Sequence, residues 1–370
     1  MDEAGEIMRA EPAGTSQTSV LADDSSSRIG SAAWRVSVLA DGGGVGVVEI
    51  ADRTWRIESL IGPRNLFQYV LAGDGRTAEA LLVDAGTSAS PRDAILPALR
   101  RLGIRAETVR YLVVTHPDLD HQGGLSILKQ ELPNAVAACG FADRGLVSEP
   151  ERLVTNRYGA YEREHGVGYT DAEKESIRDL YGSPVSIDIT FAGGEQIELG
   201  DRQLSVLHAP GHSAGHLVLY EPASGLLFSS DAVHWRFCPA ADGNAALPPT
   251  YEDVEPYLAT IDLLESLAPH ELHSGHWPAR TGSEVLGFLR ESREFVGALD
   301  AVLQERLEAP STLRELCEHV EMRLGPFGAD PVNLMFVVHG HLRRLGRRGD
   351  VRTLDPSERP RRFELAVAAR

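Results

Sequence analysis

The strongest constraint in this chain is a cluster of metal-binding side chains that directly follows an apolar segment. Residues 109–115 (VRYLVVT) have the composition of a buried strand, and His116, Asp118, Asp120 and His121 come immediately after them. A loop at a strand end can direct several side chains at one point, because the strand is anchored in a rigid scaffold. Alternate residues of an extended chain share a direction. The loop could therefore supply ligands to two metal ions that lie close together.

Four more acidic and histidine residues stand in the same kind of position, just beyond a predicted strand. They are Asp84 after residues 80–83, His212 after 204–209, Asp231 after 226–230 and His276 after 271–274. Five strand ends with such residues are hard to obtain by chance. Imidazole and carboxylate ligands together suit zinc, iron or manganese.

Strand and helix patterns alternate along the chain, which indicates the α/β class. Residues 1–30 are rich in small and polar residues and are predicted to be a disordered tail. We expect a catalytic domain over 31–295, in which the charged, tyrosine-containing segment 142–190 is a helical insertion over the site. Residues 296–370 are expected to form a small helical module that resembles a winged helix, with Ser311 as the cap of its first helix.

Composition restricts the function classes. The 54 acidic and 36 basic residues give a net charge of −18, which disfavours nucleic acid and anionic membranes. The three cysteines are far apart, so we expect neither a disulfide framework nor a cysteine-based zinc site. The acidic N-terminal segment has no apolar stretch typical of a secretory signal, and no apolar run is long enough to span a membrane. These features favour a cytoplasmic protein.

The motifs LLVDAG, THPDLDHQGG, APGHSAGH, LFSSD and SGHWP, read together, resemble those of the metallo-β-lactamase fold superfamily over roughly residues 50–295. The resemblance implies an αββα sandwich. It also implies two divalent metal ions as cofactors, with zinc the expected ion and iron or manganese as alternatives.

Carried over position by position, the resemblance implies a first metal site of His116, Asp118 and His212, and a second site of Asp120, His121 and His276. Asp231 would bridge the two ions. Asp84 would orient the metal-binding loop without binding a metal, and His216 is expected to lie beside the ligands. Because SGHWP matches the final motif of the family, His276 is favoured as the ligand over His273. The other histidines, including His234, are expected to be structural.

Position 118 departs from the family, which usually has histidine there. An aspartate adds negative charge and is a harder ligand, which shifts the preference towards iron or manganese. The related flavodiiron proteins, which hold two irons, have a glutamate at this place. Asp118 could also fail to reach the metal, and a mononuclear site of Asp120, His121 and His276 would then remain.

The resemblance implies a hydrolase that uses metal-activated water to cleave a small ester, thioester or lactone, with Asp120 also accepting the proton. Tyr158 and Tyr161 of the insertion, together with Trp235 and Phe237, are candidates for the substrate pocket. One alternative is a non-haem iron oxidoreductase, suggested by Asp118. A second is a nuclease or nucleic-acid-binding regulator, suggested by the arginines between positions 343 and 352. The partner is expected to be a small molecule, and a homodimer is an open alternative to a monomer.

Overall fold

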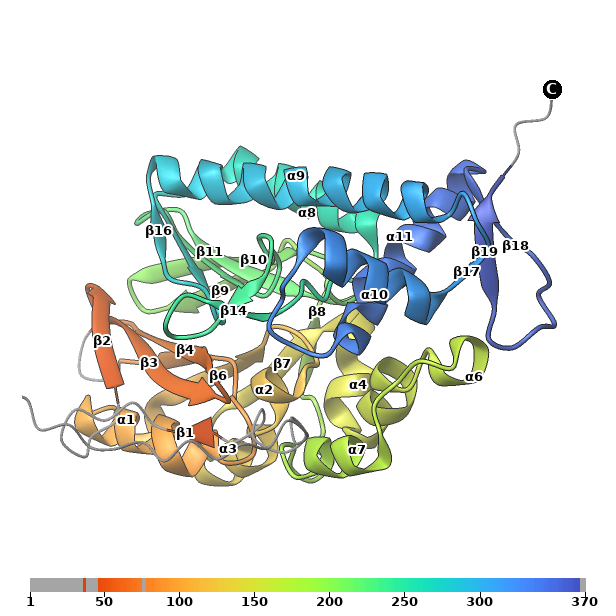
Figure 1. Ribbon diagram of the computed structural model, residues 1–370. Coiled ribbons are helices and arrows are strands. Elements are labelled where there is room, and N and C mark those ends of the chain that lie inside the picture. Colours follow the sequence, from red (N-terminus) through yellow and green to blue (C-terminus); the bar gives the residue numbers. More distant parts are fainter. Residues whose placement is uncertain (1–35, 38–45, 75–77, 367–370) are drawn as a thin grey trace, which may run out of the picture.

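Two β-sheets packed face to face form the centre of the computed structural model, which describes residues 36–37, 46–74 and 78–366 (Figure 1). The predicted tail 1–30 lies outside the described residues. The first sheet contains β1 (Val36–Ser37), β2 (Gly46–Ala51), β3 (Thr54–Ile61), β4 (Arg64–Ala72), β5 (Ala80–Val83), β6 (Val109–Val114), β7 (Val136–Gly140) and β8 (Ile189–Phe191). Its strands β5 to β8 are parallel, so the carboxyl ends of β5 and β6 meet at one edge.

The second sheet is mostly antiparallel. It contains β9 (Gln196–Leu199), β10 (Arg202–His208), β11 (Leu217–Glu221), β12 (Leu226–Ser230), β15 (Glu271–Ser274) and β16 (Arg280–Thr281), in the order β16-β15-β12-β11-β10-β9. The pairs β9/β10 and β11/β12 form two antiparallel hairpins. Strands β12 and β15 are parallel, so the loops that follow them also lie side by side.

The inner faces of the two sheets share one apolar layer. In β4, Phe67, Tyr69 and Leu71 belong to this layer, whereas the alternate residue Val70 packs on the opposite face against helices. Both faces of the strand are covered, which explains why its sequence is almost continuously apolar rather than alternating.

Helices cover both outer faces. The segment η1 (Pro91–Ile95), α1 (Leu96–Arg101) and α3 (Leu125–Glu131) packs on the first sheet, and α8 (Val254–Leu267) and α9 (Ser283–Arg306) pack on the second. Figure 1 shows these helix layers below and above the two sheets. The arrangement confirms the predicted αββα sandwich.

The predicted insertion 142–190 consists of short helices between β7 and β8. They are η3 (Phe141–Asp143), α4 (Arg144–Ser148), α5 (Glu151–Leu153), η4 (Val154–Tyr158), α6 (Glu162–His165) and α7 (Asp171–Arg178). A capping box between Thr170 and Glu173 begins α7. Smaller elements elsewhere are η2 (Ala106–Thr108), α2 (Leu119–Gln122), β13 (Cys238–Pro239) and β14 (Ala245–Leu247).

The C-terminal region, residues 307–366, follows α9. Helix α9 runs without a break through residue 296, the first residue of the predicted C-terminal module. Its elements are β17 (Ser311–Thr312), α10 (Leu313–Leu324), η5 (Pro331–Leu334), α11 (Met335–Arg348), β18 (Val351–Thr353) and β19 (Arg362–Leu365), with sheet order β17-β19-β18. The expectation that Ser311 caps α10 is wrong by one residue. Thr312 is the cap, because its hydroxyl accepts from the backbone N–H of Glu315 while the Glu315 carboxylate accepts from the backbone N–H of Thr312.

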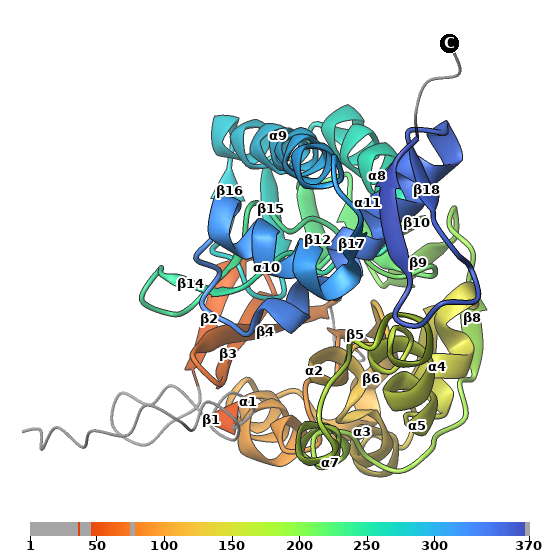
Figure 2. The ribbon, with the colours of Figure 1, turned by 45° about the vertical axis from the view of Figure 1, so that its right-hand side comes forward.

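The C-terminal region packs on both the sandwich and the insertion (Figure 2). The ring of Tyr161 in the insertion lies 5.7 Å from the ring of Phe336 and 5.0 Å from that of His339, both in α11. The arginines that suggested nucleic-acid binding are paired within the chain. The pairs are Arg343 and Arg347 with Asp253, Arg344 and Arg348 with Glu255, and Arg352 with Glu364.

No helix in the described part of the chain is both long enough and apolar enough to cross a membrane.

A polar node between α9 and α11 provides a test of this packing. The carboxylate of Asp300 contacts Nδ1 of His341 at 2.6 Å and a guanidinium nitrogen of Arg344 at 2.8 Å, and its side chain is only 15% exposed. Asp300→Ala would leave Nδ1 of the buried His341 without its partner and Arg344 with only its pair to Glu255, so we expect the free energy of unfolding in urea to fall by about 3 kcal/mol. The control Asp262→Ala breaks the exposed pair with Arg293 and should cost less than about 1 kcal/mol. Equal losses of unfolding free energy in the two variants would contradict a stabilising role of the buried Asp300 contacts.

Candidate metal centre

The predicted ligands meet at the edge where the two sheets present their strand ends. The loop 116–121 follows β6, and His212, Asp231 and His276 follow β10, β12 and β15. Two backbone hydrogen bonds join the sheets here, from Leu217 N–H to the Thr115 carbonyl and from Phe67 N–H to the Gly275 carbonyl, each at 2.9 Å. Residues that are 160 positions apart in the sequence are thereby fixed next to one another.

The side chains form two groups of three. In the first group, ligand atoms of His116, His212 and Asp231 lie within 4.8 Å of one another, and in the second group so do those of Asp120, His121 and His276. All six residues are buried.

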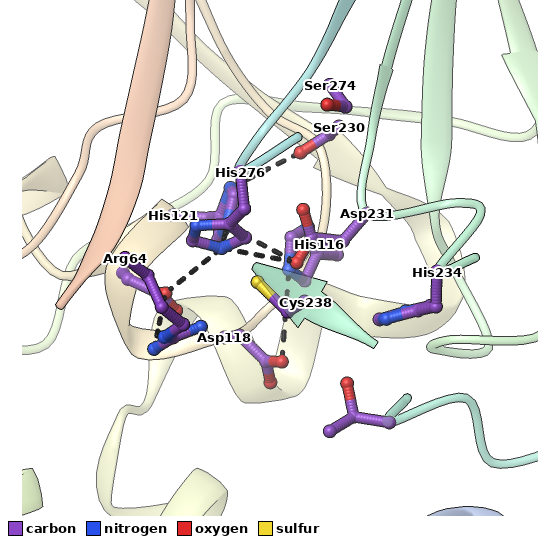
Figure 3. A network of polar contacts seen from close by, with 12 residues as sticks. Arg64, His116, Asp118, His121, Ser230, Asp231, His234, Cys238, Ser274 and His276 are labelled. Atoms are coloured by element: carbon purple, nitrogen blue, oxygen red, sulfur yellow. Dashed lines mark hydrogen bonds and ion pairs between the residues drawn. The ribbon is translucent and has the colours of Figure 1, made fainter. Parts of the chain in front are cut away.

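Asp231 lies between the two groups, as a bridging ligand must. Its Oδ2 is 3.8 Å from Nε2 of His121 and 3.4 Å from Nε2 of His276, both in the second group, although Asp231 belongs to the first (Figure 3). Oδ2 of Asp120 lies 3.3 Å from the same nitrogen of His276.

Each histidine is oriented through its other ring nitrogen. Nδ1 of His116 lies 3.0 Å from the Thr115 hydroxyl, Nδ1 of His121 lies 2.9 Å from Asp84, Nδ1 of His212 lies 3.0 Å from Nε2 of His234, and Nδ1 of His276 lies 2.6 Å from the Asn65 carbonyl. These contacts leave the four Nε2 atoms for the centre of the site. Partners of this kind fix the ring orientation of metal-binding histidines.

The unsatisfied polar atoms indicate that a cation belongs here. Nε2 of His116 and Oδ1 of Asp231 are fully buried and have no hydrogen-bond partner among the described residues, and the buried Nε2 of His212 has only the carboxylate of Asp118 beside it. Leaving a buried polar atom unpaired costs about 1–3 kcal/mol. These three atoms come from the three members of the first group, so one metal ion would satisfy all of them.

The electrostatics of the second group lead to the same conclusion. Burial opposes the charged form of His121, but the carboxylates of Asp231 and Asp84 outweigh it and raise the pKa of His121 to about 9. Burial also opposes the charged form of His276, yet Asp231 and its other neighbours raise the pKa of His276 well above its usual value. The carboxylates thus create a position for positive charge, which a divalent ion would fill.

Asp84 ties the site to the strand ends, in agreement with the predicted orienting role. It has φ +65°, a left-handed conformation that aspartate tolerates better than most residues. Its Oδ1 accepts from the backbone N–H and the hydroxyl of Thr115, each at 2.8 Å, and its Oδ2 accepts from the Ser230 hydroxyl at 2.9 Å. Its Oδ2 also lies beside Nδ1 of His121 and does not belong to either ligand group.

Asp118 does not belong to either group of three, although it was expected to be a ligand of the first site. Its Oδ1 accepts from Nε of Arg157 at 2.7 Å, while its Oδ2 lies 3.0 Å from Nε2 of His212. Burial opposes the charged form of Asp118, but Arg157 and His212 together outweigh it and lower the pKa of Asp118 below its usual value, so the carboxyl is ionised. Arg157 also pairs with Glu252 and donates to the His212 carbonyl.

The Asp118–Arg157 pair is neutral, like the imidazole that the family usually places at position 118. Arg157 lies in η4 of the insertion and is 4% exposed. Sequence reasoning missed it because 39 residues separate it from Asp118. The one signal in the sequence was an aspartate at a position where histidine is usual.

Two further histidines lie next to the ligands. His216, expected beside the ligands, is fully buried with its ring stacked 4.9 Å from that of His116, and both of its nitrogens lack hydrogen-bond partners among the described residues. His234 was expected to be structural only, but its Nε2 holds Nδ1 of His212. The backbone N–H of His234 donates to the Tyr257 hydroxyl, which fixes it in that position.

A pocket opens beside the two groups. Asp118, Asp120, Asp231 and His276 line it together with residues from other parts of the chain, which include Arg64, Arg157, Tyr158, Tyr169, Asn333 and Phe336. The insertion and α11 therefore both contribute to its wall.

Of the four predicted pocket residues, only Tyr158 lies in this wall. Tyr161 packs against Phe336 and His339 instead. Trp235 lies on Phe237, with ring centroids 4.8 Å apart, and donates its indole N–H to Glu291 of α9. Their position after Asp231 in the sequence suggested a pocket role, but neither residue lines this pocket.

A double-mutant cycle tests whether Asp118 and Arg157 act as one unit. In metal-free protein, Arg157→Met leaves the partly buried carboxylates of Asp118 and Glu252 without their cation, and we expect it to lower the free energy of unfolding by about 3 kcal/mol. Comparison of the double variant Arg157→Met/Asp118→Asn with the two single variants gives the coupling energy between the two residues, which should exceed about 1 kcal/mol. The exposed pair Arg178–Glu151 is the control, with an expected coupling below about 1 kcal/mol. If the changes in unfolding free energy of Arg157→Met and Asp118→Asn are additive, the two residues do not act as one unit.

Comparisons with known proteins agree with this architecture. Acyl-coenzyme A thioesterase MBLAC2 of Gallus gallus is 29% identical over 160 residues, which are 43% of this chain and 52% of that protein. The hydroxyacylglutathione hydrolase of Synechococcus sp. (strain JA-3-3Ab) is 32% identical over 183 residues, which are 50% of this chain and 55% of that protein. The chain thus spans about half the length of these curated relatives.

Solved structures support the fold alone, because their sequence identities are low. A metallo-beta-lactamase family protein from Thermus thermophilus superposes with a TM-score of 0.67 at 21% identity, covering 86% of this chain and 100% of that chain. A beta-lactamase domain protein from Burkholderia ambifaria gives 0.65 at 18% identity, with 86% and 93% covered. The sequence profile of the metallo-beta-lactamase superfamily matches residues 61–276, more than half of the chain. The chain therefore belongs to the metallo-β-lactamase superfamily.

Proposed function

We propose that this protein is a metal-dependent hydrolase that cleaves a small ester, thioester or lactone, with a thioester as the first candidate. The observation that carries the proposal is the pair of adjacent ligand groups, with buried nitrogen and oxygen atoms that have no other partner among the described residues. The names of the relatives include a thioesterase and a hydroxyacylglutathione hydrolase, which favours acyl transfer to water.

The proposed centre holds two divalent ions, with zinc as the expected metal. His116, His212 and Asp231 would hold one ion, and Asp120, His121 and His276 the other. When bound, such ions lower the pKa of water from about 16 towards 7 and polarise a carbonyl oxygen.

The protein residues contribute position and proton transfer. Asp120 lies at the pocket wall with its carboxylate beside His276, where it can accept a proton from water as well as bind a metal. The rings of the four histidines are held by their Nδ1 partners, so the site needs little rearrangement during the reaction. Tyr158 and Phe336, together with Tyr169, bound the space in which the acyl compound would bind.

Two observations favour the hydrolase over the alternatives. The oxidoreductase alternative rested on Asp118 as a hard, negatively charged metal ligand, and this carboxylate pairs with Arg157 and is in neither ligand group. The nucleic-acid alternative rested on the arginines of α11, which pair with Asp253 and Glu255 of the same chain.

Removal of metal tests the proposal directly. Protein purified without added metal should contain bound zinc, iron or manganese on elemental analysis. Chelation should reduce thioester hydrolysis by at least about 100-fold, and addition of the same metal should restore it. A panel of esters, thioesters and lactones, measured with and without chelator, provides the readout. Full hydrolysis by protein shown to be metal-free would contradict the proposal.

The assignment of His276 rather than His273 is tested by comparing the two alanine variants. His276→Ala should lower the metal content and reduce hydrolysis by more than about 100-fold, because it removes a ligand. His273→Ala should retain metal, since its Nε2 pairs with Glu271 and its ring packs on Phe228 and Tyr69, away from the ligand groups. Circular dichroism establishes that both variants fold. Metal loss in the His273 variant alone would reverse the assignment.

A further inference from the structure

Two arginines line the pocket beside the proposed metal centre, and they differ in how far the protein already uses them. Arg157 is fully engaged, because its guanidinium contacts Asp118, Glu252 and the His212 carbonyl. Arg64 has no such set of acceptors. No carboxylate or carbonyl oxygen in the described part of the chain lies within hydrogen-bonding geometry of its guanidinium.

The contacts of Arg64 are weak for a buried cation. Its nearest carboxylate is that of Asp120, with Oδ2 at 3.8 Å from a guanidinium nitrogen, and the thiol of Cys238, a poor acceptor, is also close. The Arg64 side chain is only 8% exposed. An arginine carries five N–H donors and remains protonated in proteins, so most donors of Arg64, which lines the pocket, have no strong acceptor among the described residues.

The position of Arg64 is fixed by the fold. It is the first residue of β4, and its backbone pairs with Ala240 in the segment between β13 and β14. The Ala241 N–H also donates to the Pro63 carbonyl at 2.8 Å. Figure 3 shows the Arg64 side chain beside His276 and the second ligand group. The backbone that carries this buried side chain is therefore fixed next to the proposed metal centre.

The charge balance of the pocket changes if metal binds. The carboxylates of Asp118, Asp120 and Asp231 line the pocket together with the guanidinium groups of Arg64 and Arg157, and these five groups leave one net negative charge. Two divalent ions would turn this into three net positive charges. Asp120, the only carboxylate paired with Arg64 among the described residues, would then also be shared with a metal ion.

We propose that Arg64 binds a carboxylate group of the substrate, so that the acyl compound hydrolysed at the adjacent metal centre is anionic. This inference rests on the proposed hydrolase function and narrows its substrate class. The planar guanidinium matches a carboxylate through two parallel hydrogen bonds. A single carboxylate fits better than a polyanion, because the protein carries a net charge of −18 that repels highly charged ligands at long range.

The test compares thioesters that differ only in one carboxylate. S-succinyl-N-acetylcysteamine and S-butyryl-N-acetylcysteamine place the difference on the acyl side. S-acetyl-3-mercaptopropionate and S-acetylpropanethiol place it on the thiol side. We expect the wild-type protein to prefer the anionic member of at least one pair by about 10- to 100-fold in kcat/KM, the value of charge-assisted hydrogen bonds. Thiol release provides the assay.

Variants at position 64 assign the preference to its guanidinium. Arg64→Met should reduce the ratio of kcat/KM between the anionic and neutral members at least tenfold, and Arg64→Lys, which keeps the charge, should retain part of it. Arg56→Met is the matched control. Arg56 lies on β3, pairs with Glu58 and does not line the pocket, so its loss should leave the ratio unchanged. Metal content is measured for every variant.

A binding measurement separates this inference from the proposed function. Succinate and butyrate are titrated calorimetrically into metal-loaded wild-type and Arg64→Met protein. We expect the wild-type protein to bind succinate at least tenfold more tightly than butyrate, and the Arg64→Met variant to lack this difference. If thioesters are hydrolysed without carboxylate preference, the inference is wrong and the function stands. If no acyl compound is hydrolysed but the Arg64-dependent binding of succinate is found, the function is wrong and the carboxylate site stands. Absence of both results overturns both.

Discussion

The carboxylate of Asp84 is the interaction on which the rest of the site depends. It accepts from the backbone and hydroxyl of Thr115 at the end of β6, from Ser230 at the end of β12, and contacts Nδ1 of His121. One buried side chain thus joins the first sheet, the second sheet and the metal-binding loop. The left-handed backbone at Asp84 turns the chain sharply after β5, which brings this carboxylate under the loop rather than past it.

A second layer of contacts closes the site from outside the sandwich. Arg157 links the insertion to the loop at Asp118, to His212 and to Glu252 before α8. Its guanidinium also lies 5.5 Å above the ring of Phe336 in α11. The insertion and the C-terminal region therefore meet over the ligands through one buried cation, and both supply residues to the pocket wall. Loop-rich segments of this kind commonly carry specificity on a rigid scaffold.

Overall charge and local charge have different consequences in this protein. The net charge of −18 acts over the whole surface and disfavours polyanions. Inside the pocket, acidic side chains are paired with arginines or directed at positions suited to cations. The acidic composition is thus compatible with the small anionic acyl compound that we propose as the substrate.

The sequence by itself determined the fold and most of the candidate ligand set. Residues such as His116, His121 and Asp231 could be identified because they follow apolar strands directly and stand in motifs that resemble those of one superfamily. Tertiary structure alone decided the partner of Asp118, the role of His234 and the exposure of Arg64 to the pocket. The contacts Arg157–Asp118 and His234–His212 join residues that are 39 and 22 positions apart in the sequence. Arg64 lines the pocket from β4, which precedes all of these residues in the chain. Periodicity and spacing describe a chain locally, whereas such contacts depend on how separate elements pack, so no local pattern could specify them.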